Sequence, residues 1–184
     1  FVRSVAEAGC GTFIVHARKA WLQGLSPKEN REVPPLDYGR VRRLKQRFPG
    51  LVIVLNGGIC NLDEAVEQLS WADGVMVGRA AYQTPYMLAG VDSRIFGMEA
   101  APVAREAVME SMIEAAAAHV ANGGRLHGLT RHMLGLYHGQ RGGRAFRRHL
   151  SENAVREGAG AAVLREALDV VTGMAGTGAR AAAE

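Results

Sequence analysis

In the stretch Leu51-Val-Ile-Val-Leu-Asn-Gly-Gly58, aliphatic residues run without interruption and then stop at one polar residue and two glycines. Two further runs have a similar form: Thr12-Phe-Ile-Val-His16 and Gly74-Val-Met-Val-Gly78. None of the three alternates polar with apolar residues, which predicts strands of a parallel sheet whose two faces are both buried. The sequence therefore predicts an α/β fold.

Helical segments lie between the predicted strands. One runs from Tyr38 to Phe48 and is closed by Pro49-Gly50. A second runs from Leu62 to Leu69, after Asn61 as a helix N-cap with Glu64 three residues later, which is the spacing of a capping box. This order of strands and helices predicts right-handed parallel crossover units.

The strand signals stop after Tyr82-Gln-Thr-Pro85, and the composition then becomes helical. We predict an α/β region over 1–95, an all-helical region over 96–172 and a disordered, Ala- and Gly-rich tail over 173–184. The helices expected in the second region are Pro102 to Val120, Leu126 to Tyr137 and Gly143 to Leu150.

The composition excludes several classes of protein. The chain has 184 residues, 48% of them apolar, but no run of about 18 uncharged apolar residues that could span a membrane. Two cysteines are too few for a disulfide scaffold, and the first residues do not have the pattern of a signal peptide. We therefore expect a cytoplasmic protein, and because the sequence begins with Phe1 we expect a fragment.

The charge is strongly segregated within a formal total of +4. Residues 16–47 and 125–150 each carry a local charge of +6, and the second block contains six arginines, four histidines and no acidic residue. Two basic blocks on an acidic remainder favour a polyanionic partner such as nucleic acid, although frequent arginine in an Ala- and Gly-rich chain would give a similar count. The loop 19–35 in the first block is long enough that we expect it to be functional.

Each predicted strand ends in residues suited to a ligand: His16-Ala-Arg18, Asn56-Gly-Gly58 and Gly78-Arg79. Carboxyl ends of parallel strands lie on one side of a sheet, where a Gly-Gly turn and an arginine can hold a phosphate. His16 is either a ligand contact or a histidine hydrogen-bonded in the core. No other His or Cys stands at zinc-ligand spacing to it, so we expect no metal site.

The two cysteines are not expected to be nucleophiles. Cys10 precedes its strand and therefore lies at the end away from the ligand side, and Cys60 stands near a helix start without a histidine close in sequence. Paired phosphate loops after the last two strands are typical of a TIM barrel, a (β/α)8 fold that needs eight strands and about 250 residues. Only three strands are evident here, so five are expected to precede them.

The sequence resembles the tRNA-dihydrouridine synthase family, specifically its A subfamily. The resemblance rests on the segment from His16 to Arg31, on Leu55-Asn-Gly-Gly-Ile59, on Asp73 to Tyr82 and on Thr130 to Leu136. It implies strands six to eight of an FMN-binding TIM barrel (1–95) followed by a helical tRNA-binding domain (96–172). The implied partner is tRNA, with no membrane, metal or evident protein partner.

The resemblance also implies the chemistry. In this family NADPH reduces FMN, the flavin passes a hydride to a uridine of the tRNA D-loop, and a cysteine protonates the other face. That cysteine corresponds to a position before Phe1, so no catalytic residue is expected in this chain, and the chain alone is expected to be inactive and to bind FMN weakly.

By resemblance, ten residues fall on family contacts. The FMN contacts are His16, Asn56, Gly57, Gly58, Gly78 and Arg79, and the tRNA contacts are Lys28, Arg31, Arg144 and Arg147. Two alternatives remain: another FMN- or phosphate-binding TIM-barrel oxidoreductase with no RNA partner, or a non-catalytic tRNA-binding module.

Overall fold

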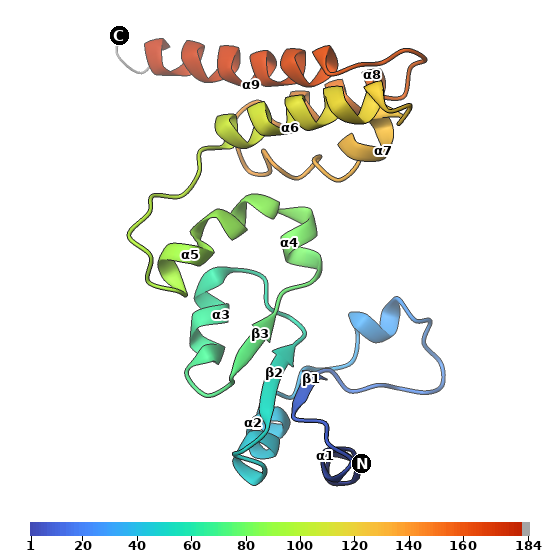
Figure 1. Cartoon of the computed structure of the whole chain (residues 1–184), viewed down its shortest axis with the longest axis vertical. Coiled ribbons are helices and arrows are strands. Elements are labelled where there is room, and N and C mark those ends of the chain that lie inside the picture. Colours follow the sequence, from blue (N-terminus) through green and yellow to red (C-terminus); the bar gives the residue numbers. More distant parts are fainter. Residues whose placement is uncertain (182–184) are drawn as a thin grey trace. The chain divides into compact units, whose positions relative to one another are not determined.

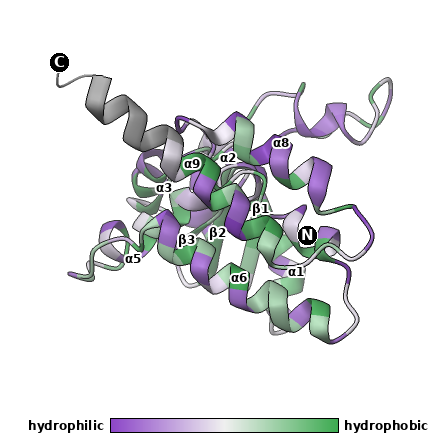
Figure 2. Ribbon diagram, turned by 90° about the horizontal axis from the view of Figure 1, so that it is seen from above, coloured by the Kyte–Doolittle hydropathy of each residue, from purple (hydrophilic) through white to green (hydrophobic). Residues whose placement is uncertain are grey.

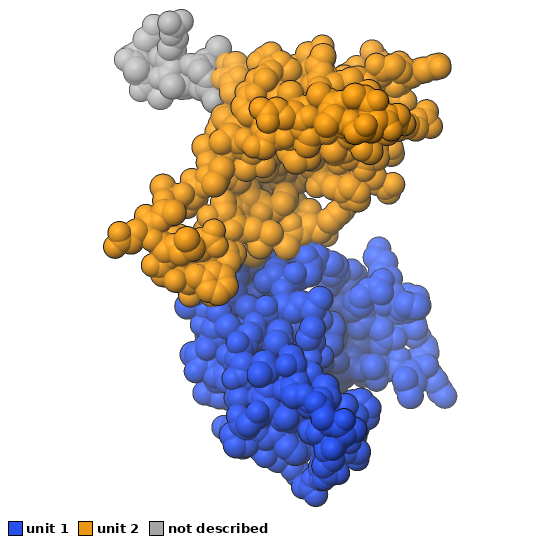
Figure 3. Space-filling model, in the orientation of Figure 1, with its two compact units in different colours: residues 1–80 blue, residues 81–184 orange. Residues whose placement is uncertain are grey.

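The computed structural model describes residues 1–181, of which 174–181 are described as helix only. The chain forms two compact units, unit 1 over Phe1–Ala80 and unit 2 from Ala81 onward (Figure 3). The two units are described separately below.

Unit 1 is built on a parallel sheet with the strand order β1-β2-β3 (Figure 1). The strands are β1 (Thr12–His16), β2 (Val52–Asn56) and β3 (Gly74–Met76). They coincide with the three apolar runs, so the predicted strands and their parallel arrangement are confirmed. The register places His16 opposite Asn56, and Asn56 opposite Met76.

Two helices of unit 1 begin at a side-chain cap. Asn61 Oδ1 accepts from the backbone N–H of Glu64 at 2.9 Å, and Glu64 Oε2 accepts in return from the N–H of Cys60 at 2.7 Å, which confirms the predicted capping interaction. Asp37 caps the next helix upstream by accepting from the N–H of Arg40. The helical elements of unit 1 are α1 (Val2–Glu7), the 3-10 turn η1 (Glu29–Arg31), α2 (Tyr38–Arg47) and α3 (Leu62–Leu69), and α4 (Arg79–Gln83) begins in unit 1 and ends in unit 2.

Burial differs between the two faces of this sheet. Ile53 and Leu55 are completely buried, whereas Ile14 is 60% exposed and Val52 is 43% exposed. Successive residues of a strand point to opposite faces, so the exposed residues share one face. The prediction that both faces are buried is therefore wrong for this chain, because the described residues leave the face that carries Ile14 and Val52 largely uncovered.

Asp73 immediately precedes β3 and connects the start of that strand to β2 and to α2. Its Oδ2 accepts from the backbone N–H of Ile53 at 2.8 Å and lies 2.8 Å from Lys45 Nζ. Lys45 also donates to the carbonyls of Pro49 and Leu51. The hydrogen bond from Ile53 and the contact with Lys45 lower the pKa of Asp73. The carboxylate therefore stabilises the folded state in its charged form.

We expect Asp73→Ala to lower the free energy of unfolding by about 1 kcal/mol, a value reduced for partial exposure of both groups. Because the folded pKa is lowered, the contribution is present above the ordinary pKa range of aspartate and is lost as pH falls through the folded value. Urea titrations at pH 7 and pH 3, read by tryptophan fluorescence, test this. Asp73→Asn retains an acceptor for Ile53 but removes the charge, so an Asn variant as stable as the unaltered chain at pH 7 would contradict a contribution from the charge.

Unit 2 contains only helical elements among its described residues. They are the 3-10 helix η2 (Pro85–Gly90), α5 (Val91–Arg94), α6 (Arg105–Ala121), α7 (Leu126–Thr130), α8 (Gly143–Asn153) and α9 (Ala162–Ala181). The helices α6, α8 and α9 pack around Met109, Phe146 and Leu164, all fully buried. In Figure 2 most of α8 is purple, because it carries arginines and other polar residues around its few core positions.

One expectation for unit 2 needs correction. The helix predicted over Leu126 to Tyr137 ends at Thr130 and continues as turns, since glycines at 128, 135 and 139 weaken a helix there. Helix α9 is assigned as far as Ala181 and so overlaps the segment 173–184, whose disorder stays a prediction. Residues 182–184 lie outside the described residues. No helix in the described part of the chain is long and apolar enough to cross a membrane.

Candidate functional site

The carboxyl ends of β1 and β2 bring two of the predicted residues together. His16 and Asn56 are the last residues of their strands and face each other in the register. The pairing extends one residue further, because the N–H of Ala17 donates to the carbonyl of Asn56 at 2.8 Å. Directly paired residues of neighbouring strands point to the same face. His16 and Asn56 therefore form the polar edge of the sheet face that exposes Ile14.

The turn that follows β2 has a backbone that glycine alone adopts readily. Gly57 and Gly58 have φ values of +108° and +78°. A Cβ atom on Gly57 would lie 3.0 Å from His16 Cε1, and one on Gly58 would overlap the side chain of Leu36. The turn thus leaves bare backbone close to His16, which is a suitable arrangement for N–H groups that approach an anion.

Tyr38 supports this turn from the start of α2. Its hydroxyl donates to the carbonyl of Gly57 at 2.8 Å. Burial, and less strongly the charge of Glu64, raises the pKa of Tyr38, so the hydroxyl keeps its proton and remains a donor at neutral pH. Sequence reasoning missed this residue, because no local signal connects Tyr38 with a turn 19 residues away.

His16 is held in one tautomer by its neighbour. Its Nδ1 accepts from the backbone N–H of Arg18 at 3.1 Å, which leaves the proton on Nε2. Burial, followed by the positive charges of Arg18 and Arg79, lowers the pKa of His16. At neutral pH the ring is therefore an uncharged hydrogen-bond donor.

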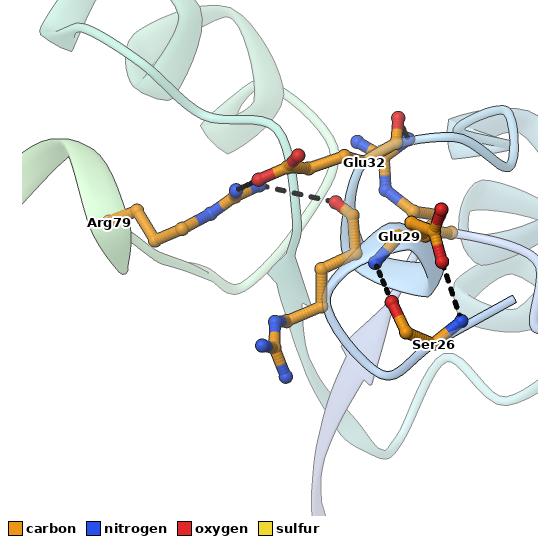
Figure 4. A network of polar contacts seen from close by, with 6 residues as sticks. Ser26, Glu29, Glu32 and Arg79 are labelled. Carbon is orange, nitrogen blue, oxygen red and sulfur yellow. Dashed lines mark hydrogen bonds and ion pairs between the residues drawn. The ribbon is translucent and has the colours of Figure 1, made fainter.

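Arg79 begins α4, immediately after Gly78, and reaches the loop that follows β1 (Figure 4). Its Nη1 lies 2.7 Å from Glu32 Oε1, and its Nη2 donates to the carbonyl of Arg31 at 3.2 Å. A guanidinium with two donors on one side matches a phosphate as well as a carboxylate. The residue predicted to hold a phosphate is thus paired with an internal carboxylate, a partner that no sequence pattern indicated.

The loop 19–35 is ordered by its own hydrogen bonds. Arg18 donates from Nη1 to the carbonyls of Glu32 and Pro34, and Ser26 and Glu29 exchange two hydrogen bonds (Figure 4). Lys28 and Arg31, the predicted tRNA contacts in this loop, are exposed. Among the residues that the structure describes, neither of their side chains has an ion-pair partner.

The other two predicted tRNA contacts, Arg144 and Arg147, lie in unit 2 on α8. Both are exposed and line a pocket of about 350 Å³ together with His138. Their spacing of three residues puts them on one side of the helix. The helix therefore presents two guanidinium groups at one surface, and neither forms an ion pair within the described part of the chain.

Cys60 contacts the turn after β2, whereas Cys10 lies at the other end of the sheet. Cys10 precedes β1, at the opposite end of that strand from His16, and donates to the carbonyl of Thr12 at 3.3 Å. Cys60 donates to the carbonyl of Gly58 at 3.2 Å. In the described part of the chain, no cluster of three or more potential metal-ligating side chains is present.

A parallel sheet with a neutral histidine and a Gly-Gly turn at its carboxyl edge defines an α/β protein, and this edge is its candidate ligand site. The sequence model described as dihydrouridine synthase (Dus) matches residues 1–172. The chain belongs to the dihydrouridine synthase family, whose members are TIM-barrel enzymes.

Curated relatives agree with this assignment. The chain is 57% identical over 171 residues to the tRNA-dihydrouridine(20/20a) synthase of Shewanella oneidensis, covering 93% of this chain and 51% of the relative. It is 52% identical to the protein of that name in Vibrio vulnificus over 91% of this chain and 52% of the relative. The protein of that name in Salmonella typhi is 53% identical, with 93% and 52% covered. The chain thus spans about half the length of these relatives.

Proposed function

We propose that this chain is part of a tRNA-dihydrouridine synthase that reduces uridines 20 and 20a of the tRNA D-loop with NADPH and bound FMN. The names of the relatives support the modification and its position. The observation that carries the proposal is the edge where His16, Asn56 and the Gly57–Gly58 turn lie together, with the charge of Arg79 acting on His16.

In this proposal, β1, β2 and β3 are strands six to eight of the TIM barrel, and the helices after about residue 96 form a tRNA-binding domain. The uncovered sheet face supports the first part. Ile14, Val52 and Met76 are 60, 43 and 44% exposed on the face that carries His16 and Asn56. Apolar residues beneath a polar carboxyl edge are the pattern of a barrel interior.

The residues at the carboxyl edge of the sheet are of chemical types that can bind FMN. The backbone N–H groups after β2, with Gly78 and Arg79 after β3, would hold the phosphate, and a side chain larger than glycine would obstruct the turn. Asn56 offers an amide, and His16 offers Nε2–H as a neutral donor. When bound, the flavin supplies the hydride chemistry that no side chain of this chain provides.

Four basic residues would bind tRNA: Lys28 and Arg31 in the loop after β1, and Arg144 and Arg147 on α8. Their side chains are exposed and lack acidic partners among the described residues, so no internal ion pair must break when a phosphate binds. Neither Cys10 nor Cys60 corresponds to the proton donor of the family. We therefore propose that the 184-residue chain alone reduces no uridine.

Removal of the α8 arginines tests the RNA part of the proposal. We expect Arg144→Gln and Arg147→Gln each to lower tRNA affinity and to reduce the slope of log K against log salt by up to about 0.9 for each phosphate that the variant no longer neutralises. Fluorescence anisotropy with labelled tRNA at several salt concentrations measures both quantities. Arg156→Gln makes the same charge change outside this surface, so its slope should be unaltered.

If the unaltered chain bound no tRNA, the alternative would be preferred: a flavin- or phosphate-binding TIM-barrel oxidoreductase without an RNA partner. If all three variants reduced the slope equally, the effect would be one of net charge rather than of a site. Measured NADPH oxidation with tRNA as substrate would contradict the proposed inactivity of the chain alone.

A further inference from the structure

A buried hydroxyl in unit 2 has no hydrogen-bond partner. Tyr137 is only 3% exposed, and its Oη contacts no donor or acceptor among the described residues. Its ring packs against Phe146, with 4.8 Å between the ring centroids. A buried hydroxyl without a partner destabilises the fold relative to a hydrogen-bonded one, so its presence in a core position requires an explanation.

Tyr137 lines a pocket of about 210 Å³, here called the Tyr137 pocket, together with the polar residues Tyr86, Arg105, Glu106, Gln140 and Arg141 and the apolar residues Ala104 and Val171. The groups that act electrostatically on the hydroxyl belong to this pocket: Glu106, Arg105 and Tyr86. Burial is the main cause that raises the pKa of Tyr137 to about 12. The hydroxyl is therefore a donor at any physiological pH.

Arg105 is oriented within this pocket by two fixed contacts. Its guanidinium carbon lies 3.6 Å from the centroid of the Tyr86 ring, and its Nε donates to the carbonyl of Leu136 at 3.0 Å. Tyr86 is fixed in turn, because its hydroxyl donates to the carbonyl of Val103 at 2.9 Å. Arg105 is thus already held in place without a ligand, and its two η nitrogens remain available as hydrogen-bond donors.

The Tyr137 pocket contains hydrogen-bond donors that have no carboxylate partner among the described residues. Arg141 and Gln140 complete it from the turn before α8, and no carboxylate in the described part of the chain forms an ion pair with Arg105 or Arg141. Glu106 also lines the pocket but is exposed. Two guanidinium groups, an amide and a phenolic hydroxyl together suit a ligand that only accepts hydrogen bonds, such as a phosphate.

The Tyr137 pocket adjoins the pocket that contains the proposed tRNA contacts of α8. Tyr137 and Gln140 also line the pocket that contains Arg144 and Arg147. We propose that the Tyr137 pocket binds a backbone phosphate of RNA next to the phosphate held by Arg144 and Arg147, with Tyr137, Arg105 and Arg141 as its donors. This inference rests on the proposed function, because it takes the ligand of α8 to be tRNA.

Tyr137→Phe is the sharpest test, because it removes one oxygen and keeps the ring. We expect tRNA affinity to fall about tenfold, as for a hydrogen bond to a charged group. The melting temperature of the free chain should be unchanged or higher, because the unsatisfied hydroxyl is gone. A purely structural role of the hydroxyl would instead lower the melting temperature and leave affinity unchanged. Arg141→Gln should weaken binding and reduce the salt slope, and Arg156→Gln is the control.

The inference and the proposed function can fail separately. If Arg144→Gln weakens tRNA binding while Tyr137→Phe and Arg141→Gln do not, the inference is overturned and the proposed function stands. A parallel titration with inorganic phosphate at constant ionic strength separates the two possible sources of the anion. If the unaltered chain binds no tRNA, and phosphate raises its melting temperature in a Tyr137-dependent way, both proposals are overturned and the pocket is a free-phosphate site.

Discussion

Gly58→Ala is expected to lower the free energy of unfolding of unit 1 by about 2 kcal/mol. The residue has a φ of +78°, where a side chain costs about 1–2 kcal/mol. A Cβ atom would also meet Leu36 and would lie 2.8 Å from the Tyr38 hydroxyl. Leu36 can move its side-chain end, but Tyr38 is held by its bond to Gly57, so the turn must shift.

Gly78→Ala is the matched control for this experiment. Gly78 belongs to the same proposed phosphate site, but its φ is not positive and nothing lies within 4 Å of the position of a Cβ atom. The Gly78→Ala substitution should lower the free energy of unfolding by less than about 0.5 kcal/mol. Both tryptophans of the chain, Trp21 and Trp71, lie in unit 1, so fluorescence during a urea titration reports this unit. Equal midpoints for the two variants would show that the turn tolerates a side chain.

Arg79→Gln is expected to lower the affinity for FMN by about 10- to 100-fold, the effect of removing a charged hydrogen-bond donor. Riboflavin, which lacks the phosphate, should bind equally to the variant and to the unaltered chain. Flavin fluorescence titrations with both ligands measure the difference. The ion pair with Glu32 is about half exposed on both sides, so its loss should change stability little.

Glu32→Gln should act in the opposite direction. Its carboxylate occupies the donors of Arg79 that a phosphate would use, so removal of the charge should raise FMN affinity several-fold. The double variant should resemble Arg79→Gln alone, because Glu32 is argued to act through that arginine. A fall in affinity with Glu32→Gln would instead indicate that the carboxylate holds Arg79 in its binding position. If Arg79→Gln lowered the affinity for riboflavin as much as the affinity for FMN, a contact between Arg79 and the FMN phosphate would be excluded.

The sequence was sufficient to predict features that depend on neighbouring residues. The ends of β1 and β2 at His16 and Asn56 follow from aliphatic runs that stop at polar residues, and the α3 cap follows from Asn61 and Glu64. Parallel strands then predict that these ends lie together, which the register confirms. The assignment of the site residues to FMN and tRNA stays a prediction.

Features that depend on contacts far apart in the chain could not be predicted. Glu32 and Arg79 are 47 residues apart, and nothing in either segment indicates the other as a partner. The Tyr137 hydroxyl lacks a hydrogen-bond partner because of how the helices pack, and the amino-acid sequence contains no local signal for this. Ile14 was expected to be buried because its run is apolar, but burial depends on what covers a face, and the described helices leave that face open.

The strand order has a consequence for the behaviour of the chain in solution. In the described residues, β1 and β3 each pair along one side only, with β2 between them. The backbone N–H and C=O groups on their outer edges can therefore form hydrogen bonds with a strand of another molecule. The exposed apolar side chains nearby would stabilise this pairing. Self-association that grows with protein concentration is the expected result, and a modest net charge of +4 offers little repulsion against it.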